Sequence, residues 1–147
     1  MGFAVLVAAM VLGGCSGLVD RGPSPTAQDF GGIVGALGAA GIVVRNPQSG
    51  NAGCTDSNLI PTAIGFEATG LGVTTPIHLR VYIFGDDAAW QRRRPDVDAC
   101  VATWWTDPAT FETVDASPYV LAGQGPWPGA FKAAIRAALL AAAGSGG

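Results

Sequence analysis

Few side chains in this sequence are of the types that catalyse reactions. The single histidine, His78, lies within a predicted strand, and Arg80 is its nearest neighbour on the same strand face. A Ser-His-Asp or Cys-His site would have to be built around this one imidazole. Because an isolated strand histidine is more often a structural or surface residue, the sequence predicts no catalytic residue.

Two aspartate pairs invite a metal-binding or acid-base interpretation. Asp86 adjoins Asp87, and Asp96 and Asp98 flank Val97. A calcium-binding loop also needs a central glycine and a distal glutamate, and both are missing here. Helix capping and a solvated helix face account for both pairs. We therefore expect no metal and no cofactor.

Tryptophans and arginines indicate a possible binding surface instead. Indole rings provide stacking area for sugars and peptides. Trp104 and Trp105 are adjacent, so on a strand their side chains would point to opposite faces of the sheet. Three consecutive arginines, residues 92–94, have two interpretations. They could bind anionic lipid head groups, or they could be cations at the end of a helix, where the helix dipole favours positive charge. The possible binding surface comprises Trp104, Trp105, Trp127, Arg92, Arg93 and Arg94.

The first of the three cysteines carries the most specific chemical signal. An uncharged apolar run at residues 3–12 has the length of a signal-peptide core and about half that of a membrane-spanning helix. It ends in Leu12-Gly13-Gly14-Cys15, which resembles the bacterial lipobox. The resemblance implies cleavage of a signal peptide, residues 1–14. It also implies diacylglyceryl on the Cys15 sulfur and an acyl chain such as palmitate on its amine.

Lipid on Cys15 predicts an extracytoplasmic protein anchored to the cell membrane or envelope. Each buried methylene contributes about 0.8 kcal/mol and stable anchoring needs about two chains, which a diacylglyceryl group supplies. Residues 15–25 are rich in Gly, Ser and Pro, and they predict a flexible tether after the lipidated cysteine. No Lys or Arg precedes the apolar run, which predicts a true start upstream of Met1.

Cys54 and Cys100 are expected to form a disulfide. Export places them in an oxidising compartment, where two leftover cysteines are more often paired than free. Lipidation consumes the thiol of Cys15, which disfavours a bond to that residue. Two buried free thiols are the alternative.

Composition indicates a single folded domain over residues 26–147. Of the 147 residues, 49% are hydrophobic and 13% are charged, so a core is available and disorder is disfavoured. A net charge of −3 and a pI near 4.8 argue against nucleic-acid binding, because phosphate binding needs a basic face.

Apolar spacing and turn residues predict helices that alternate with strands. The helices are expected at residues 26–40, at 86–100 with a break or kink at Pro95, and at 128–143, where Phe131 and Ile135 belong to an apolar stripe. Gly41 is expected to end the first helix, and Asp86 is expected to cap the second. The strands are expected at residues 42–45, 62–69, 77–84, 101–105, 111–115 and 119–122, the last two as a hairpin around Ser117-Pro118, with turns at 46–51, 70–76 and 123–127. The glycines of the first helix are expected to pack closely on a flat surface.

This order predicts an α+β fold, a mostly antiparallel sheet with helices packed on one face. The arrangement also resembles small bacterial lipoproteins of unknown function. In these, an Asp-Asp-Ala-Ala helix start follows a strand, and a late Tyr-Val-Leu strand leads through a Gly-rich turn into an Ala/Leu terminal helix. The resemblance covers residues 62–143 and implies no known activity.

We expect a non-catalytic, lipid-anchored module that contacts membrane lipid through Cys15 and binds an envelope protein or other envelope component. An envelope hydrolase using Asp, Tyr or a metal is one alternative, and a purely structural envelope protein is another. A polar cluster in one concave pocket would favour the enzyme, whereas an exposed patch containing tryptophan would favour the binder.

Overall fold

The computed structural model describes residues 29–104 and 107–144. Within them lies one five-stranded sheet in the order β1-β2-β3-β5-β4, with every neighbouring pair antiparallel. The strands are β1 (Val43–Ser49), β2 (Ala63–Gly70), β3 (Val73–Ile83), β4 (Phe111–Ala116) and β5 (Tyr119–Gln124). The helices are α1 (Asp29–Ala39), α2 (Asp87–Trp104) and α3 (Gly129–Gly144), with short 3-10 turns at Ile60–Thr62 and Pro108–Thr110. The predicted α+β class is confirmed.

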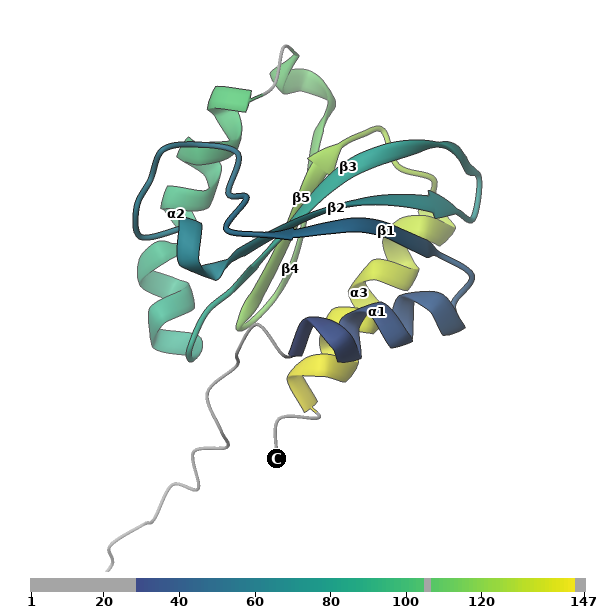
Figure 1. Cartoon of the computed structure of the whole chain (residues 1–147), viewed down its shortest axis with the longest axis horizontal. Coiled ribbons are helices and arrows are strands. Elements are labelled where there is room, and N and C mark those ends of the chain that lie inside the picture. The colour runs from purple at the N-terminus through teal and green to yellow at the C-terminus, as the bar shows by residue number, and fades with distance from the viewer. Residues whose placement is uncertain (1–28, 105–106, 145–147) are drawn as a thin grey trace, which may run out of the picture.

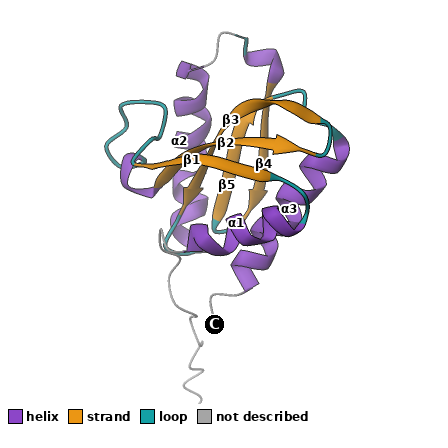
Figure 2. Ribbon diagram, turned by 45° about the vertical axis from the view of Figure 1, so that its right-hand side comes forward, coloured by secondary structure: helices purple, strands orange, loops and turns teal. Residues whose placement is uncertain are grey.

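The helices cover both faces of the sheet (Figures 1 and 2). Helices α1 and α3 lie side by side on one face, and α2 lies on the opposite face. The expectation that all helices share one face is wrong. Central strands carry apolar side chains at successive positions, as in Val120, Leu121 and Ala122 of β5, so each face needs its own cover. No described helix has the length and apolar character needed to cross a membrane.

The buried side chains form two cores, one on each face of the sheet. The larger core lies between the sheet and helices α1 and α3, and it includes Leu79 and Phe131. The smaller core lies against α2 and includes Tyr82 and Val97. The Tyr82 hydroxyl donates a hydrogen bond of 2.8 Å to the carbonyl of Ala52. Burial raises the pKa of Tyr82 to about 12, so the hydroxyl remains a donor at neutral pH.

A disulfide joins Cys54 to Cys100, as the sequence predicted, with Cα atoms 5.4 Å apart. Cys54 lies in the loop between β1 and β2, and Cys100 lies on the buried face of α2. The bond therefore attaches this loop to α2, next to the smaller core.

Two predicted helix ends are confirmed. The N–H groups of Gly41 and Ile42 donate to carbonyls of the last turn of α1 in a Schellman arrangement, and Gly41 has the positive φ of 89° that this requires. At the start of α2, the Asp86 carboxylate accepts a 2.6 Å hydrogen bond from the N–H of Ala89. Local capping residues thus set both boundaries.

The glycines of α1 do not pack on a flat surface as expected. A Cβ placed on any of them would have no atom within 4 Å outside its own helix: Gly31, Gly32, Gly35 and Gly38. The opposite side of α1 holds the helix in place through its buried side chains, which are Phe30, Ile33 and Leu37.

Pro95 does not break α2, and residues 101–104 are helical rather than extended. Proline removes one backbone donor from a helix interior. Beyond it, however, Val97, Cys100 and Val101 are buried, and Cys100 is covalently bonded to the neighbouring loop. Packing and the disulfide outweigh the local cost, so the helix continues to Trp104.

Strands β1 and β3 extend into segments that were expected to be turns. Strand β1 continues through residues 46–49, with a register shift between Arg45 and Gln48 where Asn46 has a φ of 51°. Asparagine tolerates this left-handed conformation, which allows a bulge instead of a turn. A turn was expected at residues 70–76, but only Leu71 and Gly72 separate β2 from β3, and β3 already begins at Val73.

We expect reduction of the Cys54–Cys100 bond to destabilise the domain. The bond closes a loop of 46-residue separation, for which the chain-entropy model gives about 4 kcal/mol. Thiol titration of unfolded, unreduced protein measures the pairing, and thermal unfolding with and without reductant measures its effect. Two reactive thiols from Cys54 and Cys100 would contradict the bond, and an unchanged melting temperature would contradict its stabilising role.

Replacement of Gly35 by Ala should raise the free energy of unfolding by about 0.5–1 kcal/mol, because alanine favours the helix and the added methyl meets no neighbour. Urea unfolding measures the difference. Gly70→Ala is the control. Gly70 has a φ of +124°, and the Cβ of an alanine there would collide with the Gly41 carbonyl oxygen, so this variant should destabilise the domain. A destabilising Gly35→Ala would show that this face of α1 is covered.

Candidate functional site

The arginine run does not form a joint basic surface. It lies in the middle of α2, so its interpretation as cations at a helix end is wrong. Arg93 and Arg94 each contact two carboxylates of the domain, and Arg92 is exposed without an ion pair among the described residues. The carboxylates are Asp56 and Asp96 for Arg93, and Asp98 and Asp115 for Arg94.

The described tryptophans of the expected surface lie on different faces of the sheet. Trp127 is buried in the larger core, 7% exposed, and its Nε1 donates to the Gln124 carbonyl at 2.7 Å. Trp104 is half-buried at the end of α2 and packs against the smaller core. Trp105 lies outside the described residues. Trp104 and Trp127 therefore do not form one binding patch.

A polar depression of about 290 Å³ lies on the sheet face that also carries α2. It is open because polar side chains and a glycine occupy this face of β2 and β3, while apolar neighbours such as Phe66 and Leu79 point into the larger core. We call it the polar depression, and its lining residues are Asn46, Gln48, Asn51, Gly65, Phe66, Glu67, His78 and Arg80.

Arg80 is held in the polar depression by uncharged groups. Its guanidinium carbon lies 3.9 Å from the ring centre of Trp104, and its Nε donates to the Asn51 side-chain oxygen at 3.1 Å. Within the described chain it makes no ion pair with an aspartate or glutamate. Burial lowers the pKa of Arg80, and nearby Tyr82 opposes this shift. Among the described residues, Arg80 is thus a half-buried cation without a counter-charge.

Two glycines provide the space for this arrangement. A Cβ on Gly53 would lie 2.8 Å from Arg80 Nε and 3.0 Å from Trp104, and a Cβ on Gly65 would lie 2.9 Å from the Asn51 amide nitrogen. Larger residues at either position would push Arg80 or Asn51 out of place. The position of the guanidinium therefore depends on the loop before β2 as well as on β2 itself.

Glu67 and His78 lie at the other end of the polar depression. Asn46 donates to Glu67 Oε2 at 2.9 Å, and His78 Nε2 lies 3.8 Å from Glu67 Oε1. The His78 side chain is 72% exposed. In the described residues it makes no hydrogen bond to a serine, threonine or cysteine, and no group of three or more metal-ligating side chains is present. A catalytic triad is not assembled around His78.

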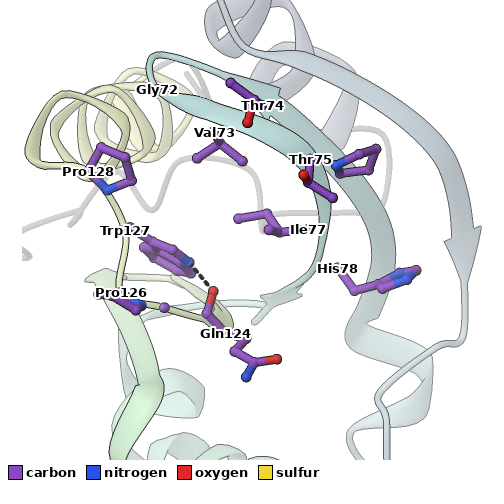
Figure 3. A pocket seen from close by; sticks show the side chains of 12 residues that line it. Gly72, Val73, Thr74, Thr75, Ile77, His78, Gln124, Pro126, Trp127 and Pro128 are labelled. Carbon is purple, nitrogen blue, oxygen red and sulfur yellow. Dashed lines mark hydrogen bonds between the residues drawn. The ribbon is translucent and has the colours of Figure 1, made fainter.

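A second hollow, of about 450 Å³, adjoins the polar depression at His78 (Figure 3). Strand β5 pairs with β3 only from Leu79 to Ile83, so residues 73–78 of β3 have an open edge beside the loop after β5. Figure 3 shows Ile77 and Trp127 turned into this hollow and His78 turned away from it. We call this second hollow the edge notch.

The open edge of β3 is unsuited to the addition of another strand. The N–H of Phe84 donates to the Pro118 carbonyl on the β5 side, and alternate residues of a strand direct their backbone groups to the same side. Pro76 therefore faces the edge notch and has no N–H to donate. A proline at such a position blocks edge-to-edge pairing.

Glu112 of β4 fixes the far wall of the edge notch. Its Oε1 accepts from the N–H of Trp127 at 2.9 Å, and its Oε2 accepts from Lys132 at 2.8 Å. Burial alone raises the pKa of Glu112, but the Lys132 ammonium and the Trp127 N–H together lower it below its ordinary value. The turn was expected at residues 123–127, but Gly123 and Gln124 still belong to β5, so the turn begins after Gln124.

No known protein family, curated protein or solved structure matches this chain. Sequence reasoning did not identify Arg80 as a site residue. One feature of the sequence could have indicated it: Arg80 stands within a predicted strand, between the apolar residues Leu79 and Val81. Charged residues rarely occupy such a position without a partner.

We expect Trp104→Ala to lower the free energy of unfolding by about 2 kcal/mol, roughly half the cost of removing a fully buried indole, and to loosen Arg80. Urea unfolding measures the stability, and the Arg80 Nε–H signal in an NMR spectrum reports its mobility. Arg92→Ala, at an exposed position of the same helix, is the control and should change stability by less than about 0.5 kcal/mol. An equally small effect of Trp104→Ala would contradict the stacking.

Proposed function

We propose that this chain is a lipid-anchored module of the bacterial cell envelope, tethered through Cys15, whose folded domain binds an envelope component in the polar depression. The observation that carries the binding role is Arg80, a half-buried cation that is held by Asn51 and Trp104 and lacks a counter-charge in the described chain. A charge in this situation costs free energy unless a partner compensates it.

The anchoring role is supported by the lipobox and by the use of the cysteines. Cys54 and Cys100 are bonded to each other, so Cys15 is the one remaining cysteine of the chain. A disulfide is also typical of exported proteins, which agrees with the signal-peptide pattern of residues 1–14.

The polar depression meets the criterion of a polar cluster in a concave pocket, which on its own favours an enzyme. Its histidine and carboxylate, His78 and Glu67, are however 3.8 Å apart and have no hydroxyl or thiol nucleophile bonded to them among the described residues. Asn46 also occupies the second oxygen of Glu67. We therefore favour binding over hydrolysis as the role of this site.

The proposal predicts the behaviour of the precursor in a bacterial host. The wild-type chain should partition into the detergent phase of a Triton X-114 extract, and Cys15→Ala should remain unprocessed or enter the aqueous phase. A photo-crosslinking residue at Arg45, an exposed β1 position opposite Glu67, should capture an envelope component in intact cells, detected as a heavier band and identified by mass spectrometry.

The matched control places the same photo-crosslinking residue at Arg136, an exposed position on α3 far from α2, where no specific adduct should form. Arg80→Gln should abolish the adduct at Arg45. Equal partitioning of the wild type and Cys15→Ala would refute the anchor. Identical adducts at both positions, or no adduct at Arg45, would refute the binding role of the polar depression.

A further inference from the structure

The guanidinium of Arg80 has donors left after its contacts within the domain. Asn51 accepts from Nε, and neither Nη1 nor Nη2 has a hydrogen-bond or ion-pair partner in the described residues. Trp104 supports one face of the guanidinium plane, so its free edge is fixed in direction. An arginine fork with two parallel N–H donors matches the two oxygens of a carboxylate.

Gln48 adds a second donor at the same place. The Asn51 amide donates to Gln48 Oε1 at 3.1 Å, so the side-chain oxygen of Gln48 is engaged. Its Nε2 has no partner in the described residues and is left as a donor in the polar depression. Asn51 thus orients both neighbours, since its oxygen holds Arg80 and its nitrogen holds Gln48.

Taking the proposed binding role as given, we propose that the polar depression binds the carboxylate group of an organic acid, with the Arg80 fork and the Gln48 amide as its donors. The bound group is either a small free acid or the C-terminal carboxylate of a peptide, because both present the same two oxygens.

The surroundings of Arg80 favour a carboxylate over a phosphate. In the described part of the chain, Arg80 is the only Lys or Arg that lines the polar depression. Glu67 lies on the same face of the sheet, two residues along β2 from Gly65, which is opposite Arg80. A phosphate carries nearly two negative charges and would be repelled by Glu67 and by the net charge of −3. One guanidinium balances the single charge of a carboxylate.

The internal carboxylate does not fill the site. Glu67 is engaged by the Asn46 amide and lies beside His78, and it forms no ion pair with Arg80. The bulge at Asn46, with its φ of 51°, belongs to the irregular part of β1 from which this side chain reaches Glu67. The hydrogen bond from Asn46 therefore keeps Glu67 away from Arg80, and the Nη1 and Nη2 donors of Arg80 remain available to a ligand.

The test is an NMR titration of the full chain in detergent, following the Arg80 Nε–H and the Gln48 side-chain amide. Sodium acetate should produce saturable shifts of both signals, and acetamide, which has a similar shape but no charge, should not. Inorganic phosphate should bind more weakly than acetate. Arg80→Gln should weaken acetate binding by at least about tenfold, as expected for loss of a charged hydrogen-bond pair. Arg80→Lys should restore only part of it, because lysine lacks the fork.

Two further variants keep the test decisive if Arg80→Gln does not fold. Gln48→Glu places a carboxylate beside Arg80 and should block acetate by occupying the fork. Arg92→Gln, on exposed α2 surface, should bind acetate like the wild type. No saturable shift at Arg80, an equal response to acetamide, tighter binding of phosphate, or wild-type acetate binding in Gln48→Glu would each overturn the proposal.

The source of the carboxylate is resolved with a pair of acetylated tripeptides, one with a free C-terminus and one amidated. Tighter binding of the free peptide than of acetate, with no binding of the amidated one, assigns peptide C-termini. Equal affinity of free peptide and acetate assigns small acids. This experiment does not depend on Cys15 or on a cellular partner, so its failure is separate from failure of the anchor or of cross-linking at Arg45.

Discussion

The covalent bond between Cys54 and Cys100 determines much of what surrounds Arg80. Trp104 lies about one helical turn beyond Cys100, so the bond that holds α2 also places this indole against the guanidinium at 3.9 Å. On the other side of the bond, the same loop carries Asn51, which accepts from Arg80 Nε. Both supports of the Arg80 side chain therefore depend on one link between a loop and a helix.

This arrangement separates Arg80 from Arg93 and Arg94, the arginines of the described chain that form ion pairs. Arg93 and Arg94 are neutralised by aspartates of their own helix and of neighbouring segments, so they stabilise the fold and offer little to a ligand. Arg80 is held by an amide and an indole, which fix its position without cancelling its charge. Because Arg80 is already ordered and has no counter-charge among the described residues, binding of an anion would require little further loss of side-chain entropy.

Local patterns predicted those elements that their own neighbours stabilise. The apolar stripe with Phe131 and Ile135 predicted α3, and the turn at Ser117-Pro118 predicted the pairing of β4 with β5. The predictions failed for α2 beyond Cys100, where a strand was expected, and for β1 beyond Arg45, where a turn was expected. In both places long-range contacts, the disulfide to Cys100 and the pairing with β2, outweigh the local preference of proline and of turn residues.

The sequence by itself determined the order of the elements apart from the strand expected at residues 101–105, the caps at Asp86 and Gly41, and the pairing of Cys54 with Cys100. These follow from short-range spacing and from the cysteine count. The sequence also predicts the lipid anchor on Cys15. Only the tertiary structure decided that the half-buried charge of Arg80 would lack a counter-charge among the described residues. Alternation along β3 specifies the side to which Arg80 points, but the residues that meet it there come from a loop and a helix remote in the chain.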